Sequence, residues 1–232
     1  MSSSLTKIHL LINFHIGYRW PISKAAAKLE LPSFQMMVRH YLYDHFYPNS
    51  EVPSYLLHDA AYPEFNGRIS IYYSATATFH SASDISSISG LRCEHIRATP
   101  SWRNGQPRYD CAFIYSKTNT LKFNVARILT FFSFVHGEEQ FQCALVHWFF
   151  CVTDGPDEDT GLWIVGPDFI ESGEPHLGII DIGSIYRAAH LMPVYGSSQY
   201  VARSLTMHDS LDTFKQFYVN KFVDYHAFGI SL

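Results

Sequence analysis

The amino-acid sequence predicts an α+β fold that is mainly β, a small antiparallel barrel or sandwich with N-terminal helices and a C-terminal helix. Three observations carry this prediction. Aromatic residues make up 16% of the 232 residues, and their rings suit the pleated surface of a sheet. Apolar residues change from helical spacing to alternation near residue 68. Short apolar runs then follow one another with turn residues between them, as in barrels and sandwiches.

The first part of the chain, residues 1–60, is expected to form a helical extension, and residues 61–232 a β-rich domain. Ser33 is a candidate N-cap for a helix that ends before Pro48. The Ala-rich stretch in residues 22–31 predicts a shorter helix ahead of it. Proline residues within 47–63 then indicate the boundary between the two parts.

Strands are expected from residue 68 onward, because Ile and Tyr alternate there with Ser. The Ser-rich residues 81–90 are expected to be a loop, and the Asn104-Gly105 pair a turn. Further short strands are predicted at residues 109–115, 162–165 and 178–182.

A long hairpin is the clearest local signal in the sequence. Apolar runs at residues 125–135 and 140–152 are separated by a short polar segment that contains Gly137. Bulky side chains on both faces predict a sheet that is buried on both sides. Near the other end, Ser210 precedes apolar residues at helical spacing as far as Tyr218, which predicts the C-terminal helix.

Composition limits the classes of function. The formal net charge is −4, whereas a surface that tracks a phosphate backbone over its whole extent is strongly basic. Any contact with nucleic acid is therefore expected to be local. The sequence has no long apolar run and no export signal at its start. We expect an intracellular, nuclear protein with reduced thiols and no membrane contact.

The cysteine and histidine pattern does not predict a metal site. Cys143, His147 and Cys151 are four residues apart within one expected strand, so neighbours are ~13 Å apart, too far for one zinc ion. The acidic turn at residues 154–161 lacks the ligand order of a calcium loop. Common catalytic motifs are absent. No metal, no cofactor and no enzymatic activity are expected.

Positive charge gathers around one tryptophan in residues 92–108. Arginine binds phosphate and an aromatic ring stacks on a base, so this segment is a candidate nucleic-acid site formed by Arg92, Arg97, Trp102, Arg103 and Arg108. In the alternative interpretation, these arginines pair with Glu94, Asp110 and the acidic turn, and Trp102 fills the barrel.

Aromatic residues suggest a second candidate site. Rings at the rim of a barrel form cages for methylated lysine through cation–π attraction. The candidates are Tyr109, Trp148 and Trp163. Packing of the same side chains in the core is the competing interpretation.

Several blocks in the chain from about Arg68 onward resemble, in the same order, the C-terminal region of fungal Plavaka-type (CACTA-like) transposon proteins. The blocks are residues 97–103 (Arg-Ala-Thr-Pro-Ser-Trp-Arg), 108–111, 141–149, 157–165, 189–196 and 209–228. The resemblance implies a ribonuclease-H-like catalytic core upstream, with three metal-binding carboxylates. None of those positions lies in this chain, which implies an accessory or stranded fragment.

The predicted hairpin is also similar to the strand pattern of bromo-adjacent-homology (BAH) modules, which bind chromatin partners. Its matching parts are residues 126–129 and 146–149. The leading hypothesis is therefore a non-catalytic interaction module, derived from a transposon protein, that helps to assemble a protein or chromatin complex. The alternative is an accessory DNA-binding domain, and a third class, hydrolysis by Asp and His side chains, requires carboxylates that converge in space.

Overall fold

Antiparallel strands make up most of the fold, as the aromatic-rich sequence predicts. The computed structural model describes residues 7–11, 19–50, 62–80, 91–116, 123–196, 205–206 and 208–228. One sheet has the order β1 (Lys7–Leu11), β4 (Ser74–His80), β5 (Leu91–Thr99) and β6 (Arg108–Tyr109). The predicted α+β, mainly β class is confirmed.

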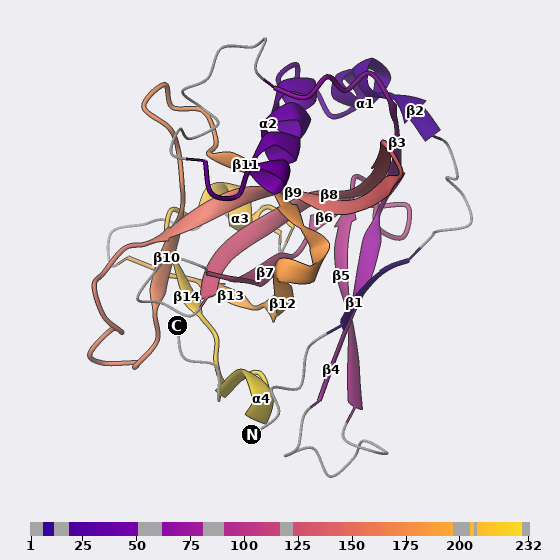
Figure 1. Cartoon of the computed structure of the whole chain (residues 1–232). Helices are drawn as coiled ribbons and strands as arrows, with labels where there is room; N and C mark the ends of the chain where they lie inside the picture. Colours follow the sequence, from indigo (N-terminus) through magenta and orange to yellow (C-terminus); the bar gives the residue numbers. More distant parts are fainter. Residues whose placement is uncertain are drawn as a thin grey trace.

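A larger sheet forms the centre of the molecule. Its strands follow the order β12 (Ile185–Ala189), β7 (Cys111–Tyr115), β8 (Phe123–His136), β9 (Glu139–Cys151), β10 (Ile164–Pro167), β14 (Phe217–Val219) and β13 (Leu191–Pro193). Away from this path, β2 (Arg19–Pro21) pairs with β3 (Arg68–Tyr72), β3 pairs with β8, and β11 (Leu177–Asp181) pairs with β9. Figure 1 shows β8 and β9 curving, so that this sheet bends into a half-barrel.

The β8–β9 hairpin is confirmed, with a two-residue loop between His136 and Glu139. Gly137, the first loop residue, has a φ of 62°, which a type II′ turn requires at that position and which glycine adopts without strain. A shift of register between Ile128 and Thr130 marks a β-bulge in β8. Large side chains such as Phe131 and Phe132 are fully buried, because other elements cover both faces of the hairpin.

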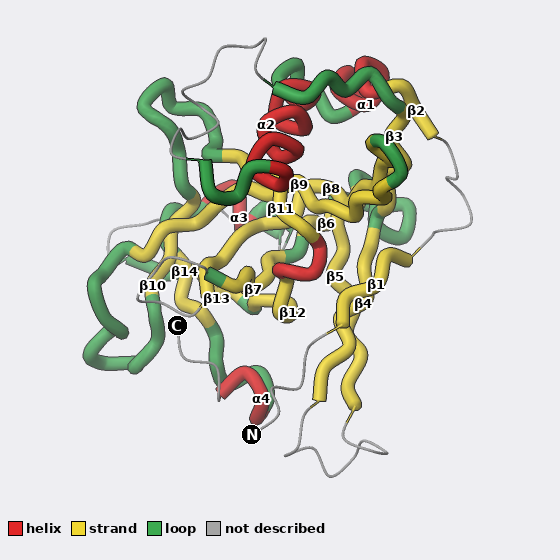
Figure 2. Tube along the Cα trace, in the orientation of Figure 1, coloured by secondary structure: helices red, strands yellow, loops and turns green. Residues whose placement is uncertain are grey.

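Two helices cover one face of this hairpin, as Figure 2 shows. They are α1 (Ile22–Lys28) and α2 (Phe34–Phe46), in the segments where the sequence predicts helices. The ring of Phe34 meets that of Phe132 at a centroid distance of 5.3 Å. Helices and sheet therefore share one apolar cluster. Ser33 precedes α2 as expected, although its side chain makes no capping hydrogen bond.

Two segments differ from the expected helices. Strands β1 and β2 lie within the first sixty residues and pair with β4 and β3. The predicted helix from Ser210 is only one turn long, α3 (Ser210–Thr213), with Asp209 as its N-cap residue. Residues Phe217–Val219 form β14 instead, because pairing with both β10 and β13 buries Phe217. Tertiary pairing here overrides the helical spacing.

The remaining elements are short. A 3₁₀ turn, η4 (Ile182–Ser184), links β11 to β12, and a one-turn helix, α4 (Tyr225–Phe228), follows β14. The expected strand at 109–115 is divided at Asp110 into β6 and β7. The expected loop at residues 81–90 and most of the expected boundary at 47–63 lie outside the described residues. Within the described part of the chain, no helix has the length and apolar character needed to cross a membrane.

Candidate functional site

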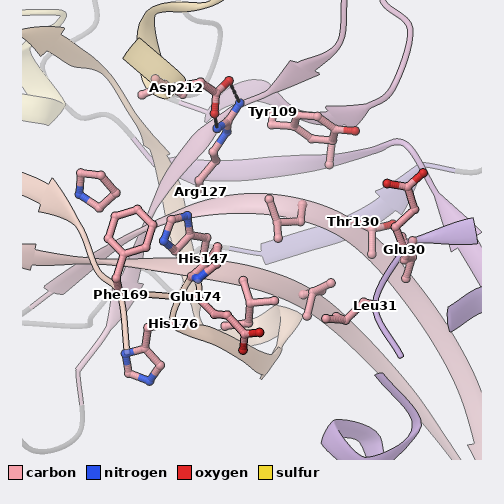
Figure 3. Close-up of a pocket in the computed structure, with 18 of the residues that line it drawn as sticks. Glu30, Leu31, Tyr109, Arg127, Thr130, His147, Phe169, Glu174, His176 and Asp212 are labelled. Atoms are coloured by element: carbon pink, nitrogen blue, oxygen red, sulfur yellow. Dashed lines mark hydrogen bonds and ion pairs between the residues drawn. The ribbon is translucent and has the colours of Figure 1, made fainter. Parts of the chain in front are cut away.

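A groove of about 1700 Å³ lies beside the helices, on the face of the β8–β9 hairpin that they partly cover. Its floor consists of β8 and β9 residues, including Arg127, Leu129 and His147, and its walls come from the α1–α2 connection, the β10–β11 loop and the α3 segment. Figure 3 shows side chains from these separate segments converging on the groove. Because binding sites in proteins are typically concave, mainly apolar and supplied with a few polar groups, this groove is the first candidate site.

One rim of the groove is apolar and open to solvent. Phe150, Phe169 and Ile170 line the groove and are 49%, 53% and 46% exposed. Large apolar side chains that gather on an open surface mark interaction sites. The ring of Phe169 packs edge-on against His147, at a centroid distance of 5.5 Å.

His147 anchors the loop that carries this rim. Its Nε2–H donates to the main-chain oxygen of Asp168 over 2.7 Å, and burial lowers the pKa of the imidazole, which favours the neutral ring. The Asp168 carboxylate lies 2.7 Å from His176 Nδ1. The first contact connects Asp168 to the floor of the groove, and the second joins the two ends of the 168–176 loop to each other.

An ion pair lies at one end of the groove (Figure 3). The guanidinium group of Arg127 contacts both carboxylate oxygens of Asp212, and the Nη2–Oδ2 distance is 3.1 Å. The carbon atom of this guanidinium group lies 5.4 Å from the ring centre of Tyr109. Sequence reasoning missed this pair, because 85 positions separate the two residues and no motif relates them.

At another end, the groove is lined by Glu30, the second residue after α1. Its φ is 53°, an unfavourable conformation for a residue with a Cβ. The backbone closes the helix with Leu31 N–H donating to Ala26 and Glu30 N–H donating to Ala27, over 3.0 and 3.3 Å. This is the Schellman pattern, which usually places glycine at that position.

The second candidate site is the arginine hairpin, defined as β5, β6 and the connecting residues 100–107. The main-chain N–H of Trp102 donates to the main-chain oxygen of Gln106 over 3.0 Å, and the main-chain oxygen of Trp102 accepts from Gly105 N–H over 2.9 Å. Arg103 and Asn104, the two central residues, have φ values of 52° and 61°, which is the type I′ pattern. The expected turn is confirmed, although Gly105 follows its two left-handed residues.

Three of the four predicted arginines surround the tryptophan. The guanidinium carbons of Arg97, Arg103 and Arg108 lie 4.3, 5.4 and 5.5 Å from the ring centre of Trp102. Arg108 also pairs with Asp110 at 2.8 Å. Burial and the neighbouring guanidinium of Arg108 lower the pKa of Arg97, which Asp110 partly offsets. The ring is half-buried, so it lies at the surface of the molecule and does not fill the barrel.

The fourth arginine, Arg92, belongs to a different cluster. It is five residues before Arg97 in β5, and side chains an odd number of residues apart point to opposite faces of a strand. Arg92 lies 3.6 Å from Asp224, whose carboxylate also binds the buried Arg187. The structure therefore brings together four of the five predicted nucleic-acid residues.

The three predicted cage residues lie in different surroundings. Tyr109 lines the groove beside Arg127. Trp148 packs against Gly178, where an added Cβ would lie 2.5 Å from the indole Nε1. Trp163 packs against the cluster around Phe217. Among the described residues, no ring contact joins any two of them, so the structure does not assemble them into a cage.

Cys143, His147 and Cys151 follow one another along β9, as predicted. Burial raises the pKa of Cys143 to about 12 and also raises that of Cys151, so both are protonated thiols. Within the residues that the structure describes, no three His, Cys, Asp or Glu side chains form a group suited to a metal ion.

No protein-family model matches the chain, and no curated protein matches its sequence. The groove and the arginine hairpin are therefore the features of the chain that bear on its function.

Proposed function

We propose that this chain is a non-catalytic interaction module whose groove binds an extended segment of a partner protein. The observation that carries the proposal is the groove itself, with the exposed Phe150, Phe169 and Ile170 along one rim. Together with the resemblance to Plavaka-type transposon proteins, it supports a role in assembling a protein or chromatin complex in the nucleus.

The shape of the groove suits an extended segment of a partner protein, rather than a flat surface of that partner, as the ligand. It is concave, and its floor and rim are apolar over much of their length. Extended peptides bind such grooves by placing alternate side chains in apolar pockets. His147, Arg127 and Thr130 supply polar groups on the floor, and these groups would orient the segment.

Selection from a displayed library of random peptides tests this function. Peptides selected on the wild-type protein should bind the Phe169→Asp variant at least about tenfold more weakly, because a charge then faces their apolar side chains. Phe222→Asp is the matched control, since Phe222 is 60% exposed and does not line the groove. Equal loss in both variants, or no selected peptide at all, would contradict the proposal.

The arginine hairpin supports a second candidate function, accessory binding of nucleic acid. The specific observation is the placement of Arg97, Arg103 and Arg108 around Trp102, with Asp110 as the single carboxylate paired with them among the described residues. The excess positive charge suits phosphate, and the indole ring suits a base. Such a local site is compatible with the net charge of −4.

Fluorescence anisotropy with labelled single-stranded and duplex DNA tests the second function. Arg103→Gln should weaken binding and lower the slope of log affinity against log salt by about one. Trp102→Leu should weaken binding of the single strand more than that of the duplex, because only unpaired bases stack on the ring. Lys24→Gln, an exposed lysine on α1, is the control, and an equal effect of Lys24→Gln and Arg103→Gln would refute the site.

A further inference from the structure

Arg127 is distinguished from the other basic side chains that line the groove. Only 13% of its side chain is exposed, whereas Lys28 and Lys215 are exposed residues at the rim. His147 shares the floor, but burial favours its neutral form. Arg127 is therefore the principal positive charge on the described floor of the groove.

The guanidinium group of Arg127 already forms a carboxylate site. It contacts both oxygens of Asp212, which is the paired geometry that arginine forms with carboxylates. The ring of Tyr109 covers it at 5.4 Å. Its Nε is buried and has no hydrogen-bond partner in the described structure, so the two terminal nitrogens, which contact Asp212, are the donors that a carboxylate uses here.

The carboxylate that occupies this site is exposed to solvent. The side chain of Asp212 is 64% exposed and belongs to α3, a single helical turn. An ion pair with one solvated partner contributes little net stability, because water competes for the exposed group. A ligand carboxylate within the groove would be less solvated, and its interaction with Arg127 would be correspondingly stronger.

We infer that the ligand of the groove carries a carboxylate flanked by apolar groups, such as an acidic side chain in an apolar peptide segment, which replaces Asp212 on Arg127. This inference rests on the proposed function, because it assigns the chemistry of the segment that the groove binds. Asp212 acts as a built-in competitor that occupies the site until a ligand arrives.

Small aromatic probes test the charge preference without a known partner. We would titrate 4-phenylbutyrate, its neutral amide and phenyl phosphate, and follow the backbone and arginine Nε–H NMR signals of the groove residues. The carboxylate should bind more tightly than the amide. Asp212→Asn should strengthen carboxylate binding by up to about fivefold, because the competing ion pair is lost, and should leave amide binding unchanged.

Two variants separate this effect from general ones. Glu158→Gln removes the same charge from the exposed acidic turn and should leave the affinity unchanged. Arg127→Met should abolish the preference for the carboxylate while the amide still binds. If Arg127→Met does not fold, Asp212→Asn still tests the inference. This variant should keep the fold, because the side chain of Asp212 is exposed.

The outcomes distinguish the two proposals. Equal binding of carboxylate and amide in the groove, with no response to Asp212→Asn, would overturn the carboxylate site and leave the apolar groove in place. Tighter binding of phenyl phosphate than of the carboxylate would also overturn it, because the preferred anion would be a phosphate. Absence of any probe from the groove, together with failure of the peptide selection, would overturn the proposed function itself.

Discussion

Two arginine clusters lie on opposite faces of β5, and they differ in how their charge is balanced. On the inner face, Arg187 is 1% exposed and contacts Asp224 at 2.8 and 2.9 Å and Glu94 at 3.2 Å. On the outer face, the arginine hairpin holds three arginines around Trp102, and one carboxylate, Asp110, pairs with Arg108.

The difference indicates different roles. A buried guanidinium must be paired and hydrogen-bonded, because an isolated charge inside a protein is very costly. Arg187 satisfies this condition and connects β12 to β5 and to the segment before α4. The half-exposed arginines of the hairpin are solvated and carry surplus charge. Balanced charge holds the fold together, whereas surplus charge at the surface is available to a ligand.

The largest expected effect on stability comes from replacing Arg187, the arginine whose charge is balanced by carboxylates. Arg187→Met should lower the free energy of unfolding by about 3 kcal/mol or more, because Asp224 and Glu94 are left without their main partner. Urea unfolding followed by tryptophan fluorescence measures this. Arg97→Met, in the surplus cluster, should change stability by less than about 0.5 kcal/mol. Similar losses in both variants would remove the distinction.

A smaller effect is expected from acid. The hydrogen bond and the charge of Arg187 hold the pKa of Asp224 well below its ordinary value, so this group stabilises the folded state fully above about pH 4. The contribution is lost as the pH falls from there towards the lowered pKa. Urea unfolding between pH 5 and pH 2 should show a steeper loss in the wild type than in Asp224→Asn. Parallel curves would contradict the assignment.

The smallest effect is expected in the arginine hairpin, at Arg103. Arg103 has a φ of 52°, which strains a residue with a Cβ but not glycine. Arg103→Gly should therefore raise the free energy of unfolding by up to about 1 kcal/mol, which thermal unfolding measures as a higher midpoint. DNA binding should weaken in the same variant. Arg103→Ala retains the strain and is the matched control. A glycine variant less stable than the alanine variant would show that the side chain supports the fold.

Local signals in the sequence predicted a large part of the fold. The β8–β9 hairpin follows from two apolar runs around Gly137, and α2 follows from apolar residues at helical spacing between Ser33 and Pro48. The segment after Ser210 has the same helical spacing, yet most of it is not helical. Its strand β14 exists because two partner strands, distant in the sequence, leave a place between them.

The sites divide in the same way. The arginine hairpin was predictable, because Arg97, Trp102, Arg103 and Arg108 are neighbours in the chain and a turn brings them together. Arg92 lies apart from these residues, because strand alternation places it on the other face, beside Asp224. The groove carries no local signal, because its residues come from segments that meet only in the folded protein.

By itself, the sequence determined the β-rich class, the central hairpin and the concentration of arginine around one tryptophan, since these depend on residues close together in the chain. Only the tertiary structure decided which face each arginine occupies, the pairing of Arg127 with Asp212 and the shape of the groove. The physical reason is that strand partners and ion pairs between distant residues depend on how the whole chain packs, which local spacing does not record.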